Sequence, residues 1–258
     1  MEWGPLAWSL LSRVRQQSPL VQCITNFVSM DLMANVLLSA GASPAMIHSL
    51  EELPEFTPNA HALCINVGTL TSHWLPAMKA AASLAVQHGK PWVLDPACTE
   101  LVDLRPTVIR GNGSEIMALA DATVGTAKGV DSAHNSMDAV EAAKSLALSS
   151  GAVVAVTGAV DIITDGHRVA GAANGVALLQ KITATGCSVT ALIAAFVAVD
   201  PTHAFEATAS ALSIFGVAAE MGIEMAKGPA SLRVHLIDSL YGIDEASVLS
   251  RVKITHMK

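Results

Sequence analysis

The chain has 258 residues, enough to bury about three quarters of its unfolded surface in one substantial core. Its residues are 52% hydrophobic but only 4% aromatic, so small and branched aliphatic side chains dominate, as they do in sheets buried on both faces. The formal net charge of -7 argues against a nucleic-acid partner, which would need a basic face.

Apolar runs of strand length alternate with longer helical patterns along the chain. Strands are predicted at 19–25, 44–49, 61–68, 90–96, 106–112 and 152–158. Helices are predicted at 27–42, 72–89, 113–121 and 137–151, with glycines ending all but the third. Residues 161–172 are expected to form an antiparallel excursion, and the chain from Gly186 onward is expected to be almost all helix. This alternation predicts an α/β fold in which one domain, residues 1–258, has a mostly parallel sheet with helices on both faces.

The stretch ITATGCSVTALIAAFVAVD, at 182–200, is the most apolar part of the chain. A membrane-spanning helix needs about 20 apolar residues, whereas the run from Ser188 to Val199 is shorter and stops at Asp200. We therefore expect a buried helix and no membrane partner. At the N-terminus the acidic Glu2 precedes the first arginine, the reverse of a secretory signal, so a cytoplasmic location is expected.

The four cysteines are far apart and form no CxxC pair, which argues against a disulfide framework or a zinc site. Cys23 and Cys64 lie in apolar strand-like runs and are predicted to be core residues. Cys187 lies at a predicted helix start, where the helix dipole is expected to lower the pKa of a thiol.

Several predicted strands end in polar or glycine-rich groups. These groups are Thr25-Asn26, Asn66 to Thr69, Asp95-Pro96, Arg110 to Gly113 and Thr157-Gly158. Ligands of parallel sheets bind beyond the carboxyl ends of the strands, so the groups together predict a binding rim. Neither a GxxxxGK[ST] phosphate-binding loop nor a dinucleotide fingerprint is present in the sequence.

Thr185, Gly186 and Cys187 fall at the start of the apolar helix, where the first backbone amides have no partner within the helix. Such a start favours anions and could hold a transferring phosphoryl group. The alternative interpretation is a tight turn with a small-residue cap.

A set of motifs resembles the hydroxyethylthiazole kinase family. The motifs are ITN (24–26), GASPAM (41–46), NVGTL (66–70), VLDP (93–96), VIRGNGSEI (108–116), KGVDS (128–132), VAVTGAVDIITDG (154–166) and TATGC (183–187). They occur in the family's order, from about residue 19 to about residue 235. The resemblance implies a ribokinase-like three-layer sandwich that transfers the γ-phosphoryl group of ATP to the primary alcohol of 4-methyl-5-(2-hydroxyethyl)thiazole in thiamine salvage. It also implies Mg²⁺ as a cofactor and a homotrimer with active sites at subunit interfaces.

The resemblance also assigns roles by position. It implies that Met46, Asn26 and Ala184 bind the thiazole alcohol, and that Arg110, Thr157 and Asn112 bind ATP. Asp95 and Glu115 are expected near the metal, and Thr185, Gly186 and Cys187 are expected to form an anion hole. Cys187 takes the place where related sugar kinases carry an aspartate base, and a thiol there is expected to orient the hydroxyl more than deprotonate it.

Two departures from the family pattern stand out. Ala184 replaces a glycine, which restricts the backbone there. The glycine-rich loop of the DPVGxGATxxR kind is shortened after Asp95-Pro96, and no glycine follows until Gly111. Three alternatives stay open: a hydroxymethylpyrimidine or vitamin B6 kinase, an ATP-dependent dehydratase of hydrated NAD(P)H, and a trimeric binding protein without turnover.

Overall fold

One sheet runs through the molecule. The structure, a computed structural model, describes residues 2–95, 99–124 and 136–257. Within these ranges nine strands pair in the order β2-β1-β3-β4-β5-β6-β7-β8-β9. The strands are β1 (Leu20–Ile24), β2 (Ser43–Ala45), β3 (Ala62–Asn66), β4 (Trp92–Asp95), β5 (Val108–Asn112), β6 (Val153–Thr157), β7 (Asp161–Thr164), β8 (Val169–Ala172) and β9 (Ile254–Met257). The strands from β2 to β6 in this order are parallel, whereas β7, β8 and β9 are antiparallel at one edge.

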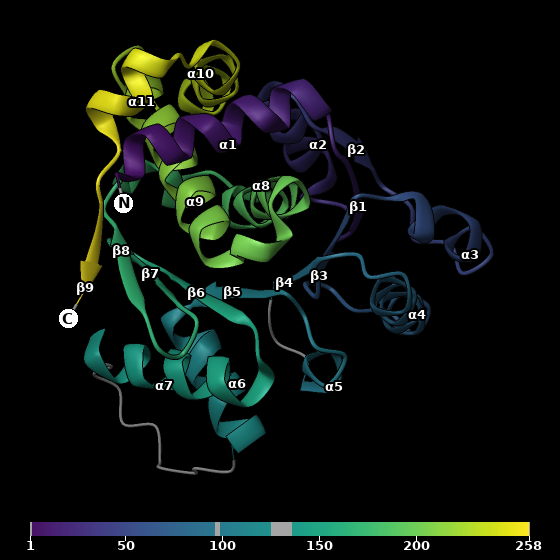
Figure 1. Cartoon of the computed structure of the whole chain (residues 1–258). Coiled ribbons are helices and arrows are strands. Elements are labelled where there is room, and N and C mark those ends of the chain that lie inside the picture. Colours follow the sequence, from purple (N-terminus) through teal and green to yellow (C-terminus); the bar gives the residue numbers. More distant parts are fainter. Residues whose placement is uncertain (1, 96–98, 125–135, 258) are drawn as a thin grey trace.

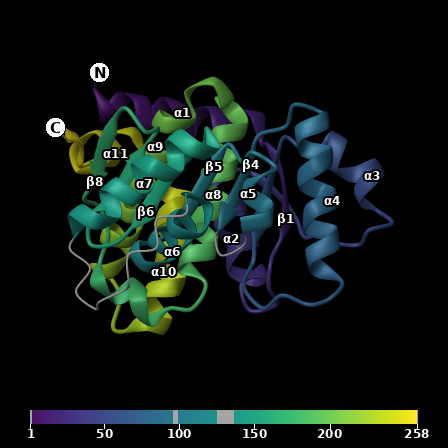
Figure 2. The ribbon, with the colours of Figure 1, turned by 90° about the horizontal axis from the view of Figure 1, so that it is seen from below.

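Helices cover both faces of the sheet (Figure 1). They are α1 (Trp3–Gln17), α2 (Met30–Ala40), α3 (Leu53–Phe56), α4 (Trp74–Gln87), α5 (Thr99–Val102), α6 (Gly113–Val124), α7 (Ser136–Ser150), α8 (Thr185–Val199), α9 (Ala204–Ile223), α10 (Pro229–Gly242) and α11 (Glu245–Arg251). Short 3₁₀ turns lie at η1 (Thr57–Asn59), η2 (Ala177–Lys181) and η3 (Pro201–His203). One layer contains α1, α2 and α8 to α11, and the other contains α4 to α7; Figure 2 views the second layer from below.

Side chains of the central strands alternate between two hydrophobic cores, one on each face. On β3, Cys64 joins the core under α8 and α9, while Leu63 and Ile65 join the core under α4, α6 and α7. β6 behaves in the same way, with Ala155 in the first core and Val154 in the second. A strand buried on both faces needs apolar residues at every position, and this explains the aliphatic runs in the sequence. The predicted sandwich is confirmed.

The predicted helix at 182–200 is confirmed as a buried one. Every residue of α8 from Ser188 to Val197 is buried, and the helix packs against α1, α2, α9 and the sheet. No helix within the described ranges is long and apolar enough to cross a membrane. Glycines end the predicted helices where expected, with Gly41 at φ 94° after α2 and Gly151 at φ 73° after α7.

The sequence interpretation was incomplete at both ends of the chain. It assigned no fold role to α1, although residues Trp3, Ala7, Leu10, Leu11 and Val14 are buried at helical spacing. The expectation that the chain after Gly186 is almost all helix is confirmed by α8, α9, α10 and α11, with the short β9, which pairs antiparallel with β8, as the exception. Only Ile254 of β9 is buried, so the strand carries almost no hydrophobic pattern in the sequence.

Candidate active site

The polar strand ends predicted to form a rim meet at one edge of the sheet. Asn66 and Asp95 are opposite each other at the ends of β3 and β4, and Asn112 is opposite Thr157 at the ends of β5 and β6. Because the parallel strands β1, β3, β4, β5 and β6 are neighbours in this order, their carboxyl ends form a continuous line. The predicted rim is therefore present in the structure.

Asp95 and Arg110 form a buried ion pair at the centre of this rim. Arg110 Nη1 donates to Asp95 Oδ1 at 3.2 Å, and the two side chains are only 13% and 7% exposed. Asn66 Nδ2 donates to the other carboxylate oxygen at 2.6 Å. A charge that is largely removed from water needs a partner, because a buried charge without one strongly destabilises the folded state.

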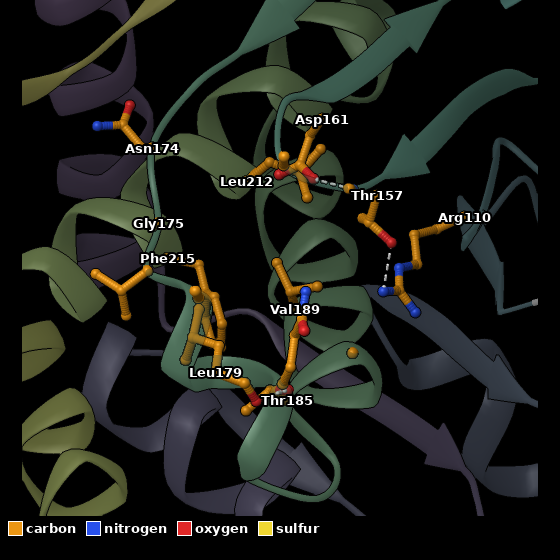
Figure 3. Close-up of a pocket in the computed structure, with 17 residues that line it drawn as sticks. Arg110, Thr157, Asp161, Asn174, Gly175, Leu179, Thr185, Val189, Leu212 and Phe215 are labelled. Atoms are coloured by element: carbon orange, nitrogen blue, oxygen red, sulfur yellow. Dashed lines mark hydrogen bonds between the residues drawn. The ribbon is translucent and has the colours of Figure 1, made fainter. Parts of the chain in front are cut away.

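Arg110 also faces the neighbouring strand. Its Nη2 donates to Thr157 Oγ1 at 2.7 Å (Figure 3), and Thr157 in turn donates to the carbonyl oxygen of Gly111 at 3.2 Å. The buried Arg110 Nε makes no hydrogen bond to any described residue. The guanidinium is thus held by two partners among the described residues, and its Nε–H stays without one.

The hydrogen-bond network extends to β1 through Asn66. Asn26 Nδ2 donates to Asn66 Oδ1 at 3.0 Å, while Asn26 Oδ1 accepts the amide of Ser29 at 3.1 Å. Asn66 therefore connects Asn26 with Asp95. The sequence predicts that Asn66 lies on the rim but predicts no role for it, because side-chain geometry decides which strand-end residue links the others.

The start of α8 lies against the same guanidinium. Its N-cap residue Ala184 has a left-handed backbone (φ 65°) and no side-chain cap, and the amide of Ser188 is the first that bonds back, to Ala184. The amides of Thr185, Gly186 and Cys187 therefore precede the helical ladder. A Cβ on Gly186 would lie 2.8 Å from Arg110 Nη1. A cation and the positive end of a helix dipole thus stand side by side, an arrangement that favours an anion between them.

Cys187 is half-buried beside Asn66, whose Nδ2 donates to its Sγ at 3.3 Å. Burial and then the Asp95 carboxylate raise the pKa of the Cys187 thiol, and Arg110 acts in the opposite direction. The expectation that the helix dipole would lower this pKa was wrong, because desolvation and a nearby carboxylate outweigh the dipole. A thiol with a raised pKa is neutral near pH 7 and is a hydrogen-bonding group rather than a base.

A cavity of about 390 Å³ opens beside Arg110 and the start of α8. Arg110, Thr157 and Thr185 make one end polar, whereas Leu212 and Phe215 of α9 belong to its apolar lining. Figure 3 shows these residues around one space. The further lining comes from Gly158, Ala159, Asp161, residues 174–177, 179 and 180, Gly186, Val189 and Gly216. A polar end beside an anion-favouring helix start, together with apolar side chains from α8 and α9, suits a ligand that joins phosphates to a flat ring.

Asp161 is a lining residue that sequence analysis did not select. Its Oδ1 accepts the amide of Gly158 at 2.9 Å, which closes the turn between β6 and β7. Burial raises the pKa of Asp161 to about 6, and the Gly158 hydrogen bond and the Arg110 charge oppose that rise. An aspartate after a Gly-Ala-Val turn gives no sequence signal for such an environment.

Asn112 and Glu115 lie together but outside the cavity lining. The Asn112 amide donates to Glu115 Oε2 at 2.8 Å, and the Glu115 amide donates to Asn112 Oδ1 at 3.0 Å. This reciprocal pair caps α6 as a capping box. An ATP contact for Asn112 and a metal contact for Glu115 therefore stay predictions.

Met46 lies just beyond β2, partly buried against the core under α8. Gln22 of β1 fixes the next residue, since its Nε2 donates to the carbonyl oxygen of Ile47 at 3.0 Å. No hydrogen bond joins Met46 to the Asn66 network among the described residues, so its substrate role stays a prediction.

The donors at the rim suit a magnesium ion shared with phosphates better than a metal held by protein alone. No group of three His, Cys, Asp or Glu side chains that could hold a metal occurs within the described ranges. Mg²⁺ retains several waters and needs only one or two carboxylates when phosphates supply further ligands. Asp95 at the rim meets that requirement.

The family model described as the hydroxyethylthiazole kinase family matches residues 11–246 of the chain. The chain belongs to this family. A hydroxyethylthiazole kinase of Arabidopsis thaliana is 64% identical and covers 99% of this chain and 97% of the relative. One from Zea mays is 61% identical, with 98% and 94% covered. The solved hydroxyethylthiazole kinase structure from Pyrococcus horikoshii OT3 has a TM-score of 0.91 at 41% identity, covering 98% and 100%.

A Staphylococcus aureus pyridoxal kinase structure, 16% identical, has a TM-score of 0.62 and covers 92% of this chain and 97% of that one. At that identity the likeness shows the fold alone. The predicted ribokinase-like fold is confirmed.

The relatives contain residues that this chain lacks. The Arabidopsis alignment spans 267 positions whereas this chain has 258 residues, so at least nine positions find no counterpart here. This agrees with a shortened segment after Asp95, although residues 96–98 lie outside the described residues.

Proposed function

We propose that the chain transfers the γ-phosphoryl group of ATP to the primary hydroxyl of 4-methyl-5-(2-hydroxyethyl)thiazole, the step that thiamine salvage requires. Family membership supports the activity. The observation that carries the site is the buried Arg110 guanidinium against the uncapped start of α8, at the polar end of a cavity of about 390 Å³. We place ATP in this cavity, with its phosphates toward Arg110, Thr157 and Gly186.

In the proposed reaction, the substrate oxygen forms a bond to the γ-phosphorus, the bond from that phosphorus to the bridging oxygen breaks, and ADP leaves. Such transfer is catalysed mainly by positioning and by neutralising charge on the phosphoryl oxygens. The bare amides of Thr185, Gly186 and Cys187, together with Arg110, are suited to this charge. The neutral Cys187 thiol orients the hydroxyl, which keeps its proton until late in a loose transition state and then passes it to an oxygen of the transferred phosphoryl group.

Mg²⁺ is proposed as the cofactor, and when bound it neutralises charge on the phosphates. Asp95 would hold it through water, since both of its carboxylate oxygens already accept hydrogen bonds. Glu115 is proposed as the second carboxylate, because only its Oε2 is used by the cap of α6.

The thiazole alcohol is proposed to bind on the β1 side of Cys187, near Asn26, Met46 and Ala184. Large apolar side chains are exposed around the ends of β1 and β3, with Phe27 at 74% and Val28 at 65%. Exposed apolar surface of this kind supports an interface with further copies. We propose a homotrimer with active sites at the interfaces, formed by a cytoplasmic chain folded as one domain.

The deciding experiment is transfer of label from [γ-³²P]ATP to the thiazole alcohol, run beside an ATP-binding measurement. We expect labelled thiazole phosphate with the wild type, and much less label on pyridoxal or hydroxymethylpyrimidine. ATP binding without transfer to any of the three alcohols would contradict the proposal and would favour a binding protein.

A further inference from the structure

We propose that the C-terminal segment Arg251–Lys253 positions the wall of the ATP cavity through Asn174, which makes Asn174 a positioning residue for nucleotide binding. The inference rests on the proposal that this cavity receives ATP. The segment lies beyond residue 246, where the match to the family model ends.

Asn174 uses its whole side-chain amide. The residue is only 8% exposed. Its Oδ1 accepts from Ser213 Oγ at 2.5 Å and from the Lys253 amide at 2.8 Å, and its Nδ2 donates to Glu220 Oε1 at 3.1 Å and to the Arg251 carbonyl oxygen at 2.8 Å. Two acceptor and two donor positions are thus filled, half of them by the C-terminal segment.

The neighbours of Asn174 are held to the same elements. The Ala173 amide donates to the Lys253 carbonyl oxygen at 2.9 Å, and the Gly175 amide donates to Glu220 Oε1 at 3.1 Å. Three consecutive residues of the chain are therefore tied to α9 or to the C-terminal segment.

Asn174 also begins one wall of the cavity. Residues 174–177 line it, as does Gly216 of α9. A Cβ on Gly216 would lie 2.6 Å from the Asn174 backbone, so the wall is pressed directly against the helix. Figure 3 shows the Asn174 side chain directed away from the cavity, so the amide fixes the wall from behind without touching a ligand.

This arrangement predicts different effects on the binding of the two substrates. Arg110 and Thr157 line the same cavity as residues 174–177, so a shift of that wall changes the space for ATP. Asn26 and Asn66, on the proposed thiazole side, contact neither Asn174 nor the C-terminal segment in any hydrogen bond of the described residues. Losing the link should therefore affect ATP and spare the alcohol.

The link from Lys253 is its backbone amide, and this permits a matched pair of variants. Lys253→Pro removes the amide hydrogen, and Val252 before it (φ -61°, ψ 126°) already has a backbone that proline accepts. Lys253→Ala keeps the amide and removes the exposed side chain, whose ammonium lies 3.4 Å from Glu220 Oε1.

We expect Lys253→Pro to raise the KM for ATP roughly fivefold, the factor for one ordinary hydrogen bond. The KM for the thiazole alcohol and kcat should stay within twofold of wild type, and Lys253→Ala should match wild type in all three. Asn174→Asp should raise the KM for ATP further, because it sets a carboxylate against Glu220. If the proline variant does not fold, Ser213→Ala replaces it, since that change removes the other donor to Asn174 Oδ1.

Equal KM values for ATP in the proline and alanine variants would overturn the inference, and so would an equal rise in the KM values for ATP and for the thiazole alcohol in a folded variant. Thr157→Val serves as the reference for the cavity itself. If it weakens ATP binding while Lys253→Pro does not, the inference alone fails. If Thr157→Val has no effect either, the cavity is not the nucleotide site, and the placement of ATP falls together with the inference.

Discussion

Two helices begin at the carboxyl edge of the same sheet and begin in opposite ways. The capped start of α6 (Asn112 to Glu115) satisfies two of its own amides, because Asn112 and Glu115 bond reciprocally. The open start of α8 (Ala184 to Cys187) has no side-chain cap and faces Arg110. A helix start that satisfies itself needs no ligand, whereas an open one beside a cation is completed by an anion.

The largest effect should come from removing the cation. Arg110→Ala is expected to lower phosphoryl transfer by a factor on the order of 10²–10³, because the open start of α8 then lacks its companion charge. Single-turnover assays and ATP titrations measure this loss. The fold should also lose about 3 kcal/mol, since Asp95 is left buried without its partner.

Arg110→Lys is the control for charge alone. It keeps the positive charge, but one ammonium cannot contact both Asp95 and Thr157 as the planar guanidinium does. Unchanged ATP affinity in Arg110→Ala would remove this residue from the site and break the comparison.

The second test adds the same methyl group to both helix starts. Gly186→Ala on α8 should lower transfer about 100-fold, because its Cβ would lie 2.8 Å from Arg110 Nη1. Gly113→Ala on α6 should keep wild-type activity, since the nearest atom to its Cβ would be 3.8 Å away. Transfer rate per folded molecule is the measurement. Normal transfer by the α8 variant would show that its open start is only a turn.

Cys187→Ser sharpens the role of the open start of α8. Turnover should fall about tenfold with both substrates still bound, a smaller loss than the 10²–10⁴ expected for a general base. Because the pKa of the thiol is raised, little thiolate forms between pH 6 and 8. The wild-type rate should therefore show no rise from thiolate formation over that range. A pH–rate profile and thermal melts check this. Lower melting temperature with normal turnover would instead identify Cys187 as a packing residue.

Ala184→Gly addresses the strain at the open start of α8. A non-glycine residue at φ 65° is disfavoured, so glycine should stabilise the fold by about 1 kcal/mol. Ala194→Gly, inside the same helix, should destabilise it by a similar amount. Denaturant unfolding of the two variants gives the comparison, and equal losses in both would contradict a strained Ala184.

The smallest effect is expected at the capped start of α6. Glu115→Gln preserves the capping box, because glutamine also fits it, but removes one negative charge. A few-fold rise in the Mg²⁺ midpoint of activity is expected if this carboxylate helps hold the metal. Asp95→Asn, at the rim, should raise the midpoint further. An unaltered midpoint in the Glu115 variant would leave that residue with capping alone.

The sheet and its rim were predictable because they follow from periodicity and from the rule that parallel strands align their carboxyl ends. Asn26, Asp95, Arg110 and Thr157 meet as expected for that reason. The departure at Ala184 was visible in the sequence, and the backbone at this position is left-handed, a conformation that glycine adopts without strain.

Other properties depend on distances that no pattern encodes. The predicted direction of the Cys187 pKa shift was wrong, because the shift depends on burial and on the Asp95 carboxylate, which lies 92 positions earlier in the chain. The folded structure is also needed to see three further features. These are the role of Glu115 in the cap of α6, the link that Asn66 makes between Asn26 and Asp95, and the four hydrogen bonds of the Asn174 side chain.

The burial of α8 has a consequence for motion. The helix is buried from Ser188 to Val197, and this buried body leaves the half-buried first turn little room to move away from a ligand or toward one. The donors at its start therefore keep one position through every turnover, and a phosphate must come to them. Any domain or loop movement during the reaction therefore has to occur in the segments around α8. These segments would move relative to a helix that stays in place.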